Sequence, residues 1–263
     1  MGVTKTLPKN RIDTRTSPIA SHLFSLRRSL RKLLAFLEVQ WVLGTHGTDR
    51  LLQRRFNRWA RRGRGESMER GHARIAQTIW KRMELSATDR ILDLGCGQGW
   101  ACRVMAQRAP QGCLVMGIDI SDEMIRRARE NSPSLCNVTY QCGQAQHIPR
   151  PANYFTKIIS IEAFYYFERQ DEVLQELFRV MQAGGQLYLL LCLFRDDHKP
   201  KGWFEDVSLP VHNRSISEYE DMLRRTGWID VISQVFDFGA DAAEEGDDHD
   251  RPLLVTARKP WPH

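Results

Sequence analysis

The sequence contains no uninterrupted run of about 18 apolar residues, the length that a helix needs to cross a bilayer. Nor are the basic residues near the N-terminus followed by the apolar core of a secretory signal peptide. We therefore expect neither a membrane-spanning nor a secreted protein. Hydrophobic residues make up 42% of the 263 positions, which is enough to fill the core of one domain with an extension.

Cysteine is scarce, and no pair of cysteines or of cysteine and histidine has a spacing that suits zinc. The acidic segment at 237–250 also lacks a ligand spacing, so we expect a solvated hairpin loop there and no metal site. Most cysteines fall within expected strands or helices, which is typical of reduced, buried thiols in an intracellular protein. The six are Cys96, Cys102, Cys113, Cys136, Cys142 and Cys192.

Acidic residues are few in the first quarter of the chain. Residues 1–70 hold 16 Lys or Arg against 5 Asp or Glu, an excess of +11, so the formal net charge of +6 leaves −5 for the remainder. The basic character therefore belongs to the N-terminal part. The high isoelectric point is no sign that the rest of the chain binds nucleic acid.

Residues 1–21 show no hydrophobic periodicity and are rich in Ser, Thr, Lys and Arg, so we expect a disordered basic tail. At 22–41, leucines recur at spacings of three and four with basic residues between them, which predicts a basic amphipathic helix. Three interpretations stay open. The helix packs on the domain or on a protein partner, lies on a membrane surface, or acts as an organellar transit peptide.

The segment at 51–64 predicts a second helix, with arginines around Phe56 and Trp59. Basic and aromatic residues together can bind phosphate and stack on bases. Because no RNA-binding module is recognisable, we expect solvated arginines, two aromatic rings docked on the domain, and no nucleic-acid partner. Residues 22–65 are thus read as a basic helical arm. Its clustered arginines are Arg54, Arg55, Arg58, Arg61, Arg62 and Arg64.

The most informative stretch is ILDLGCGQG, at residues 91–99. An apolar run that contains Asp93 leads into three alternate glycines, Gly95, Gly97 and Gly99, and a helix-compatible segment follows. This order predicts a strand, a tight turn and a helix whose amides face a bound ligand. The spacing differs from GxGxxG, which seats a dinucleotide pyrophosphate.

Two further landmarks follow the glycines at suitable distances. The apolar run at 114–118 ends in Asp119, and a carboxylate at the end of a strand can accept both hydroxyls of a ribose. Another run, at 157–161, ends in Glu162 and is preceded by a Gly-Gln-Ala loop at 143–145.

Together these residues resemble the motifs of the class I S-adenosylmethionine-dependent methyltransferases, in particular the type 11-like members that act on small molecules. The resemblance covers roughly residues 66–260. It implies a Rossmann-like, doubly wound α/β sheet of seven mostly parallel strands, the last one antiparallel. The strands and helices that alternate from residue 90 onward predict the same class. The expected helices lie at 73–83, at 100–108, at 122–130 with Ser121 as its cap, at 171–181 with Gly184 and Gly185 as its end, and at 218–225 with Ser217 as its cap, and a buried strand is expected at 186–194. The arm would then be an N-terminal helical extension of this domain.

The resemblance implies S-adenosylmethionine as cofactor. The family more often has Asp where this chain has Gln144, but an amide can still accept a hydrogen bond from the adenine amino group. The expected cofactor-binding residues are Asp93, Gly95, Cys96, Gly97, Gly99, Asp119, Ile120, Met124, Gln144, Ala145 and Glu162. In similar enzymes the helix before the first strand can contact the methionine part, which adds Met68, His72 and Arg74 as weaker candidates.

The Asn or Asp-Pro-Pro-Tyr motif of many amino methyltransferases is missing after the strand expected at 155–161. The aromatic run at 164–167 instead offers a wall for an apolar or planar acceptor, although adjacent side chains cannot all face one pocket. A general base is needed only where the nucleophile is protonated near pH 7. The candidates are His198, His212, Tyr165, Tyr166 and Glu162, of which Glu162 is expected rather in the cofactor pocket, and the sequence does not decide between the others.

We therefore expect transfer of a methyl group from S-adenosylmethionine to a small, apolar or aromatic metabolite. Two alternatives stay open. One is an RNA or protein methyltransferase that uses the arginine-rich arm, and the other is a non-catalytic scaffold that recruits a membrane or protein partner through residues 22–41. We expect a cytoplasmic protein, with peripheral membrane association or organellar import left open.

Overall fold

The computed structural model describes residues 47–197, 209–238 and 251–262. The tail expected at 1–21, the helix expected at 22–41, His198 and most of the acidic loop lie outside these ranges. Those predictions stay predictions.

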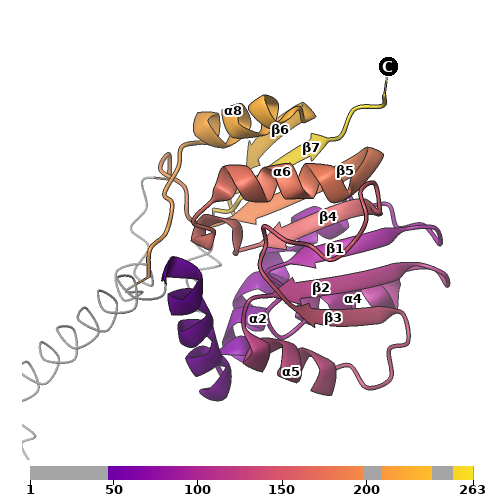
Figure 1. Cartoon of the computed structure of the whole chain (residues 1–263), viewed down its shortest axis with the longest axis vertical. Coiled ribbons are helices and arrows are strands. Elements are labelled where there is room, and N and C mark those ends of the chain that lie inside the picture. Colours follow the sequence, from indigo (N-terminus) through magenta and orange to yellow (C-terminus); the bar gives the residue numbers. More distant parts are fainter. Residues whose placement is uncertain (1–46, 198–208, 239–250, 263) are drawn as a thin grey trace, which may run out of the picture.

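Seven strands form one sheet in the spatial order β3-β2-β1-β4-β5-β7-β6 (Figure 1). The first five strands in this order, β3, β2, β1, β4 and β5, pair in parallel, and β7 runs antiparallel to both β5 and β6. The predicted fold class is therefore confirmed. The strands are β1 (Arg90–Leu94), β2 (Leu114–Asp119), β3 (Val138–Cys142), β4 (Phe155–Ile161), β5 (Met181–Leu191), β6 (Ile229–Val235) and β7 (Leu253–Arg258).

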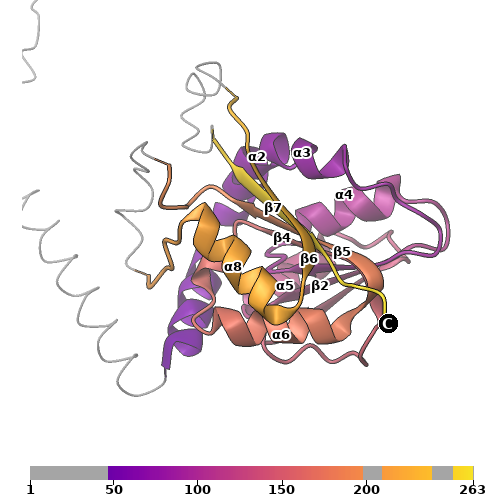
Figure 2. The same cartoon turned by 90° about the horizontal axis from the view of Figure 1, so that it is seen from above.

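Helices cover both faces of the sheet, and Figure 2 shows α2, α3 and α4 on one side with α6 and α8 on the other. No helix in the described ranges is long and apolar enough to cross a bilayer. The labelled helices are α2 (Arg64–Ile75), α3 (Gln77–Trp80), α4 (Trp100–Arg108), α5 (Asp122–Glu130), the 3₁₀ turn η1 (Phe164–Tyr166), α6 (Gln170–Val180) and α8 (Ile216–Thr226).

The central strands are apolar on both faces because each face packs against helices. In β1, Ile91 faces the core under α4 and α5, whereas Leu92 faces the core under α6 and α8. In β4, Ile159 and Ile158 divide in the same way. Burial on both sides explains why these segments read as continuous apolar runs.

The chain before β1 is helical earlier than predicted. The sequence predicted a helix at 73–83, but α2 begins at Arg64 and the short α3 follows it. Gly63 has a φ of 71°, in the left-handed region that glycine adopts at low cost. It turns the chain between α2 and a preceding helix at residues 47–61, predicted at 51–64, which we call the 47–61 helix.

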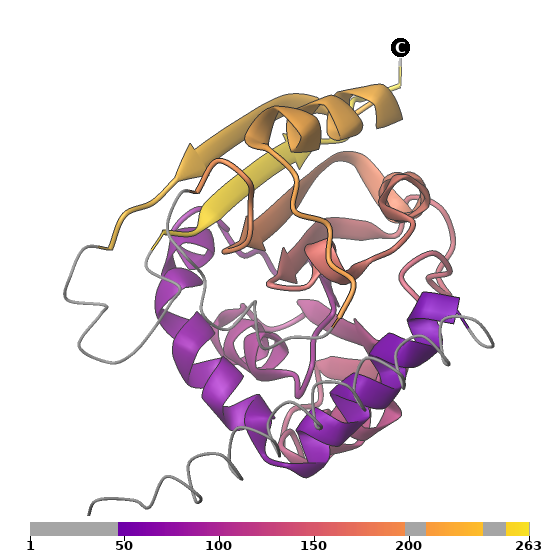
Figure 3. The same ribbon diagram turned by 90° about the vertical axis from the view of Figure 1, so that its left-hand side faces the viewer.

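The 47–61 helix lies at the carboxyl ends of the strands. Figure 3 shows this helix and α2 as two arms that meet at their connection and frame that end of the sheet. Leu51 and Leu52 are buried in the core under α6 and α8. This part of the expected arm therefore packs on the sheet domain, and the boundary expected between residues 65 and 66 falls inside α2.

The end of α6 was predicted wrongly. The sequence predicted a helix to Met181, a cap at Gly184 and Gly185, and a strand from residue 186, but β5 already begins at Met181. The Trp261 ring packs on Gly184 so closely that a Cβ there would lie 2.4 Å from it. Lys259 Nζ donates to the carbonyl oxygen of Met181 at 2.7 Å. Contacts from the distant C-terminal segment thus extend the strand.

The start of α8 was also predicted two residues late. Ser215, not Ser217, is the N-cap, and it forms a capping box with Glu218. By contrast, the predicted bounds of α4 and α5 and the Ser121 cap of α5 agree with the structure.

The ion pair between Asp89 and Lys157 supports a first prediction. Lys157 Nζ lies 2.7 and 2.8 Å from the two carboxylate oxygens of Asp89, which is only 4% exposed. Burial raises the pKa of Asp89, but hydrogen bonds from Lys157, Thr156 and the Ser86 N–H outweigh it and hold that pKa below its usual range.

We expect Asp89→Asn to lower the free energy of unfolding by about 3 kcal/mol, because it leaves Lys157 without its counter-charge. Urea denaturation measures this change. The matched control is Asp230→Asn, which breaks an exposed pair with Arg258 and should cost less than about 1 kcal/mol. Equal effects of the two substitutions would contradict the prediction.

Candidate functional site

The glycine turn after β1 is tied to the end of β2. The N–H groups of Gly95 and Cys96 both donate to the carbonyl oxygen of Ile118, at 2.8 and 3.0 Å. Gly95 has a φ of 79°, and a Cβ on it would lie 2.3 Å from the Cβ of Ala163. Only glycine therefore allows the turn to lie against the end of β4.

Asp119 completes this connection from the carboxyl end of β2. Its Oδ2 accepts from the Gly97 N–H at 2.9 Å and its Oδ1 from the Ser121 N–H at 2.8 Å. Burial raises the pKa of the Asp119 carboxyl to about 6, although the two N–H groups act to lower it. A carboxylate offers about four lone-pair sites, so Asp119 can accept two further hydrogen bonds from a ligand.

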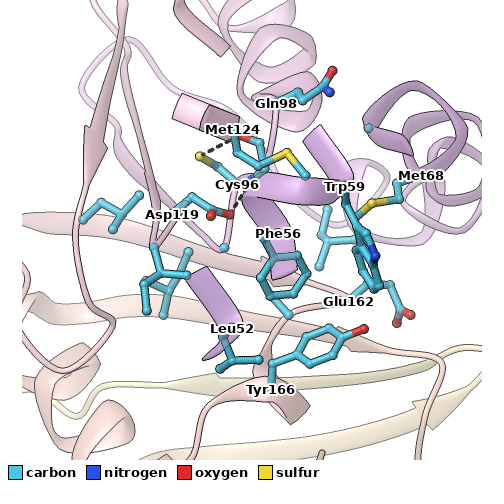
Figure 4. Close-up of a pocket in the computed structure, with 18 of the residues that line it drawn as sticks. Leu52, Phe56, Trp59, Met68, Cys96, Gln98, Asp119, Met124, Glu162 and Tyr166 are labelled. Atoms are coloured by element: carbon cyan, nitrogen blue, oxygen red, sulfur yellow. Dashed lines mark hydrogen bonds between the residues drawn. The ribbon is translucent and has the colours of Figure 1, made fainter. Parts of the chain in front are cut away.

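The turn and Asp119 border one cavity of about 930 Å³ (Figure 4). Gly97 faces open space within it, because a Cβ there would meet no atom within 4 Å. Eight of the eleven predicted cofactor residues line this cavity. They are Gly95, Cys96, Gly97, Asp119, Ile120, Met124, Ala145 and Glu162.

Asp93 and Gly99 are not among the lining residues. Asp93 is 2% exposed and lies behind the turn, where the Cys102 thiol donates to its Oδ2 at 3.2 Å. Burial raises the pKa of Asp93 to about 7, and the nearby charge of Asp119 adds to this effect. A Cβ on Gly99 would lie 2.5 Å from the Tyr140 ring. Both residues shape the turn from its protein side.

Gln144 is the third predicted cofactor residue that does not line the cavity. Its Nε2 donates to Asp49 Oδ2 of the 47–61 helix at 3.1 Å. The next two residues of its loop, Ala145 and Gln146, line the cavity instead, and Gln146 is buried. The sequence could not reveal this, because the partner of Gln144 lies 95 residues earlier in the chain.

The 47–61 helix covers the cavity with three apolar side chains, Leu52, Phe56 and Trp59. The Phe56 ring meets those of Trp59 and Tyr166 edge to face, with centroids 5.3 and 5.2 Å apart. We call the part of the cavity bordered by Leu52, Phe56, Trp59 and Tyr166 the aromatic chamber (Figure 4). The sequence predicted that these two rings dock on the domain, but not that they line a cavity.

Glu162 lies beside the aromatic chamber at the end of β4. Its Oε2 accepts from the Tyr165 hydroxyl at 2.9 Å, and its Oε1 accepts from the Cys192 N–H. The backbone of Glu162 has a φ of 54°, which is uncommon outside glycine and frequent at functional sites. Two fixed donors and a strained backbone thus hold a buried carboxylate at the cavity wall.

Like Glu162, two of the other candidate bases line the cavity, namely Tyr165 and Tyr166. Burial raises the pKa of both hydroxyls, so both stay protonated at neutral pH. His212 is not among the lining residues, and its backbone N–H donates to the Tyr165 carbonyl oxygen at 2.8 Å. Burial and the charge of Arg214 lower the pKa of His212.

Among the weaker candidates, Met68 and His72 of α2 line the cavity. Arg74 does not, since its guanidinium donates to the Phe238 carbonyl oxygen at 3.2 Å. Gln98, which was not among the predicted site residues, lines the cavity and packs directly on Gly65 of α2. Its place between two glycines of the motif was the signal available. In the described part of the chain, no group of three or more His, Cys, Asp or Glu could hold a metal ion.

The central part of the sheet matches a known family. Residues 92–189 match the family described as methyltransferase domain. The sterol 24-C-methyltransferase erg6 of Schizosaccharomyces pombe is 28% identical over 210 residues, 75% of this chain and 51% of that protein. The methyltransferase GfsG of Streptomyces halstedii is 28% identical over 141 residues, 52% of this chain and 48% of that protein. The chain thus spans about half the length of these curated relatives.

Solved structures agree with the sequence relatives. One chain in the complex of the Haloferax volcanii Trm112 methyltransferase activator with a putative methyltransferase superposes with a TM-score of 0.69. It is 25% identical, and the match covers 78% of this chain and 98% of that one. The sheet order, the glycine turn tied to Asp119 and these similarities agree, and they identify the matched region as a methyltransferase domain of the class I S-adenosylmethionine-dependent type.

Proposed function

We propose that this protein transfers the methyl group of S-adenosylmethionine to a small, apolar or aromatic acceptor. One observation carries the proposal. A single cavity joins the glycine turn and Asp119, which suit the cofactor, to the aromatic chamber, which suits the acceptor. Methyl transfer needs the two ligands side by side, so this continuity is the required geometry.

The residues present fit the cofactor. Asp119 would accept the two ribose hydroxyls, and the apolar side chains of Ile120, Met124 and Ala145 would flank the adenine. The backbone of the Gly95–Gly97 turn would lie along the amino-acid part. When bound, S-adenosylmethionine supplies a methyl group on a positively charged sulfur, which is already an activated leaving group.

The cavity is large for a ligand pocket. Such pockets measure roughly 300–1,000 Å³, and at about 930 Å³ this cavity lies at the upper end of that range. Its size suits a nucleoside cofactor with a compact acceptor beside it. The 47–61 helix covers the acceptor end and would exclude water from the reacting atoms.

The lining of the aromatic chamber favours an apolar acceptor. Phe56 and Trp59 are turned into the cavity, so these rings are not presented for stacking on bases. This orientation favours a small molecule over RNA. The similarity to the sterol 24-C-methyltransferase of S. pombe supports the same conclusion, because a sterol is an apolar metabolite.

Neither Tyr165 nor Tyr166 is suited to act as a general base. Tyr165 and Tyr166 stay protonated because burial disfavours the phenolate. Their hydroxyls and rings would orient the acceptor rather than remove its proton. The carboxylate of Glu162, which borders the chamber, is better suited than the two tyrosines to accept a proton.

The proposal is tested by incubating the full-length protein with methyl-labelled S-adenosylmethionine and cell extract. We expect label in the organic-soluble small-molecule fraction. Deleting residues 1–46 should leave this labelling unchanged, since the 47–61 helix is kept. Label found only in RNA or protein and lost on that deletion would contradict the proposal.

Asp119 gives cofactor binding a pH dependence. Its carboxyl pKa is about 6, and only the ionised form accepts from both ribose hydroxyls. S-adenosylhomocysteine should therefore bind with full affinity above about pH 7, where Asp119 is ionised, and more weakly as the pH falls through 6. We expect the Kd from calorimetry to be about tenfold higher at pH 5 than at pH 7.5. Asp119→Asn should bind at least about tenfold more weakly at pH 7.5 and lose this pH dependence. A wild-type Kd that stays constant between these pH values would refute the assignment.

A substitution of Trp59 tests whether the aromatic chamber binds the acceptor. Trp59→Ala removes a large apolar surface from the chamber, which is worth about tenfold or more in acceptor affinity. We expect the labelling rate at limiting extract to fall at least about tenfold, while the Kd for S-adenosylhomocysteine changes less than about threefold. Tyr166→Phe, which keeps the ring, is the matched control. A large loss of cofactor affinity in Trp59→Ala would instead place Trp59 on the cofactor.

A further inference from the structure

Asn57 attaches the 47–61 helix to the first turn of α5. Its Nδ2 donates to Asp122 Oδ1 at 2.7 Å. Its Oδ1 accepts from the Ser121 hydroxyl at 2.5 Å and from the Glu123 N–H at 3.2 Å. One amide thus makes three hydrogen bonds to three consecutive residues that lie more than 60 positions away in the sequence.

These contacts complete the N-terminus of α5. The first four N–H groups of a helix have no partner within it. Ser121, the N-cap, satisfies the N–H of Met124, and Asn57 satisfies that of Glu123 from outside the helix. The 47–61 helix therefore acts as a second cap for α5.

The same hydrogen bonds lead directly to the cofactor site. Ser121, whose hydroxyl donates to Asn57, donates its N–H to Asp119 Oδ1. The other oxygen of Asp119 holds the Gly97 N–H. A continuous chain of hydrogen bonds thus runs from the covering helix to the carboxylate expected on the ribose and on to the glycine turn.

Asn57 is also adjacent to the residues that form the aromatic chamber. Phe56 precedes it and meets the Tyr166 ring, and Trp59 follows two positions later. A displacement of the helix at Asn57 would move both rings away from the cavity wall. The position of Asn57 therefore decides whether the chamber is complete.

We propose that Asn57 is the positioning residue that couples the acceptor chamber to the cofactor site. It holds the 47–61 helix closed through the first turn of α5, so that an occupied ribose site and a closed chamber stabilise each other. Such linkage is reciprocal and works through one free energy of coupling. This inference rests on the proposed function, since it assigns the two ends of the cavity to cofactor and acceptor.

Hydrogen exchange of the full-length protein, with and without S-adenosylhomocysteine, tests the proposal. In the wild type we expect the ligand at 100 times its Kd to slow exchange of the amides at 47–61 by up to about 100-fold. In Asn57→Ala, those amides should exchange about tenfold faster without ligand, because three hydrogen bonds are lost. The ligand should then slow them less than about threefold. Amides of β1 and β4 report whether the variant keeps its core.

Exchanging the amide and the carboxylate between positions 57 and 122 distinguishes coupling from a general loss of stability. Asn57→Asp places a carboxylate against Asp122 and should open the helix. Adding Asp122→Asn restores a donor and acceptor pair and should return the exchange toward the wild-type rate. Gln53→Ala, one turn earlier on the same helix, is the matched control and should behave as the wild type.

Three outcomes would overturn the proposal. They are unchanged exchange at 47–61 in Asn57→Ala, full protection of that variant by the ligand, and no recovery in the double variant. If calorimetry finds no binding of S-adenosylhomocysteine to the wild type, the proposed function fails. The ligand-free exchange rates still decide whether Asn57 holds the helix.

Discussion

The site depends on one set of hydrogen bonds, those that fasten the glycine turn to the end of β2. Parallel pairing of β1 and β2 brings their carboxyl ends to the same edge of the sheet. The carbonyl oxygen of Ile118 and the carboxylate of Asp119 then take three N–H groups of the turn. Without them the turn would have no fixed direction, and its open face at Gly97 would not border the cavity.

Burial of Asp119 has a cost, and the surrounding backbone offsets part of it. Removing the carboxylate from water favours its neutral form, which is why its pKa rises to about 6 despite two N–H donors. Asp93 lies close behind with a pKa of about 7, and each negative charge disfavours the other. A ligand that donates two hydroxyl groups to Asp119 would favour its ionised form. The buried carboxylate of Asp119 is thus suited to a polyhydroxyl partner.

What the sequence could predict was determined by local physics. The glycines, the Ser121 cap and the apolar runs act within a few residues, and the α/β fold class follows from alternating strands and helices. The errors have distant causes. Trp261 packs on Gly184, and Asp49 takes the amide of Gln144. No periodicity records a partner that lies 77 or 95 residues away, so neither contact could be foreseen.

The 47–61 helix shows what the composition of the arm could and could not predict. The sequence predicted that Phe56 and Trp59 dock on the domain, but not that these rings line the cavity or that Leu51 and Leu52 are buried. This helix precedes the region that matches the family, which begins at residue 92. The family match covers the residues expected on the cofactor but not Phe56 and Trp59, which form part of the chamber wall. A match to this family therefore carries no information on that wall, and the acceptor preference has to be derived from the side chains of the 47–61 helix.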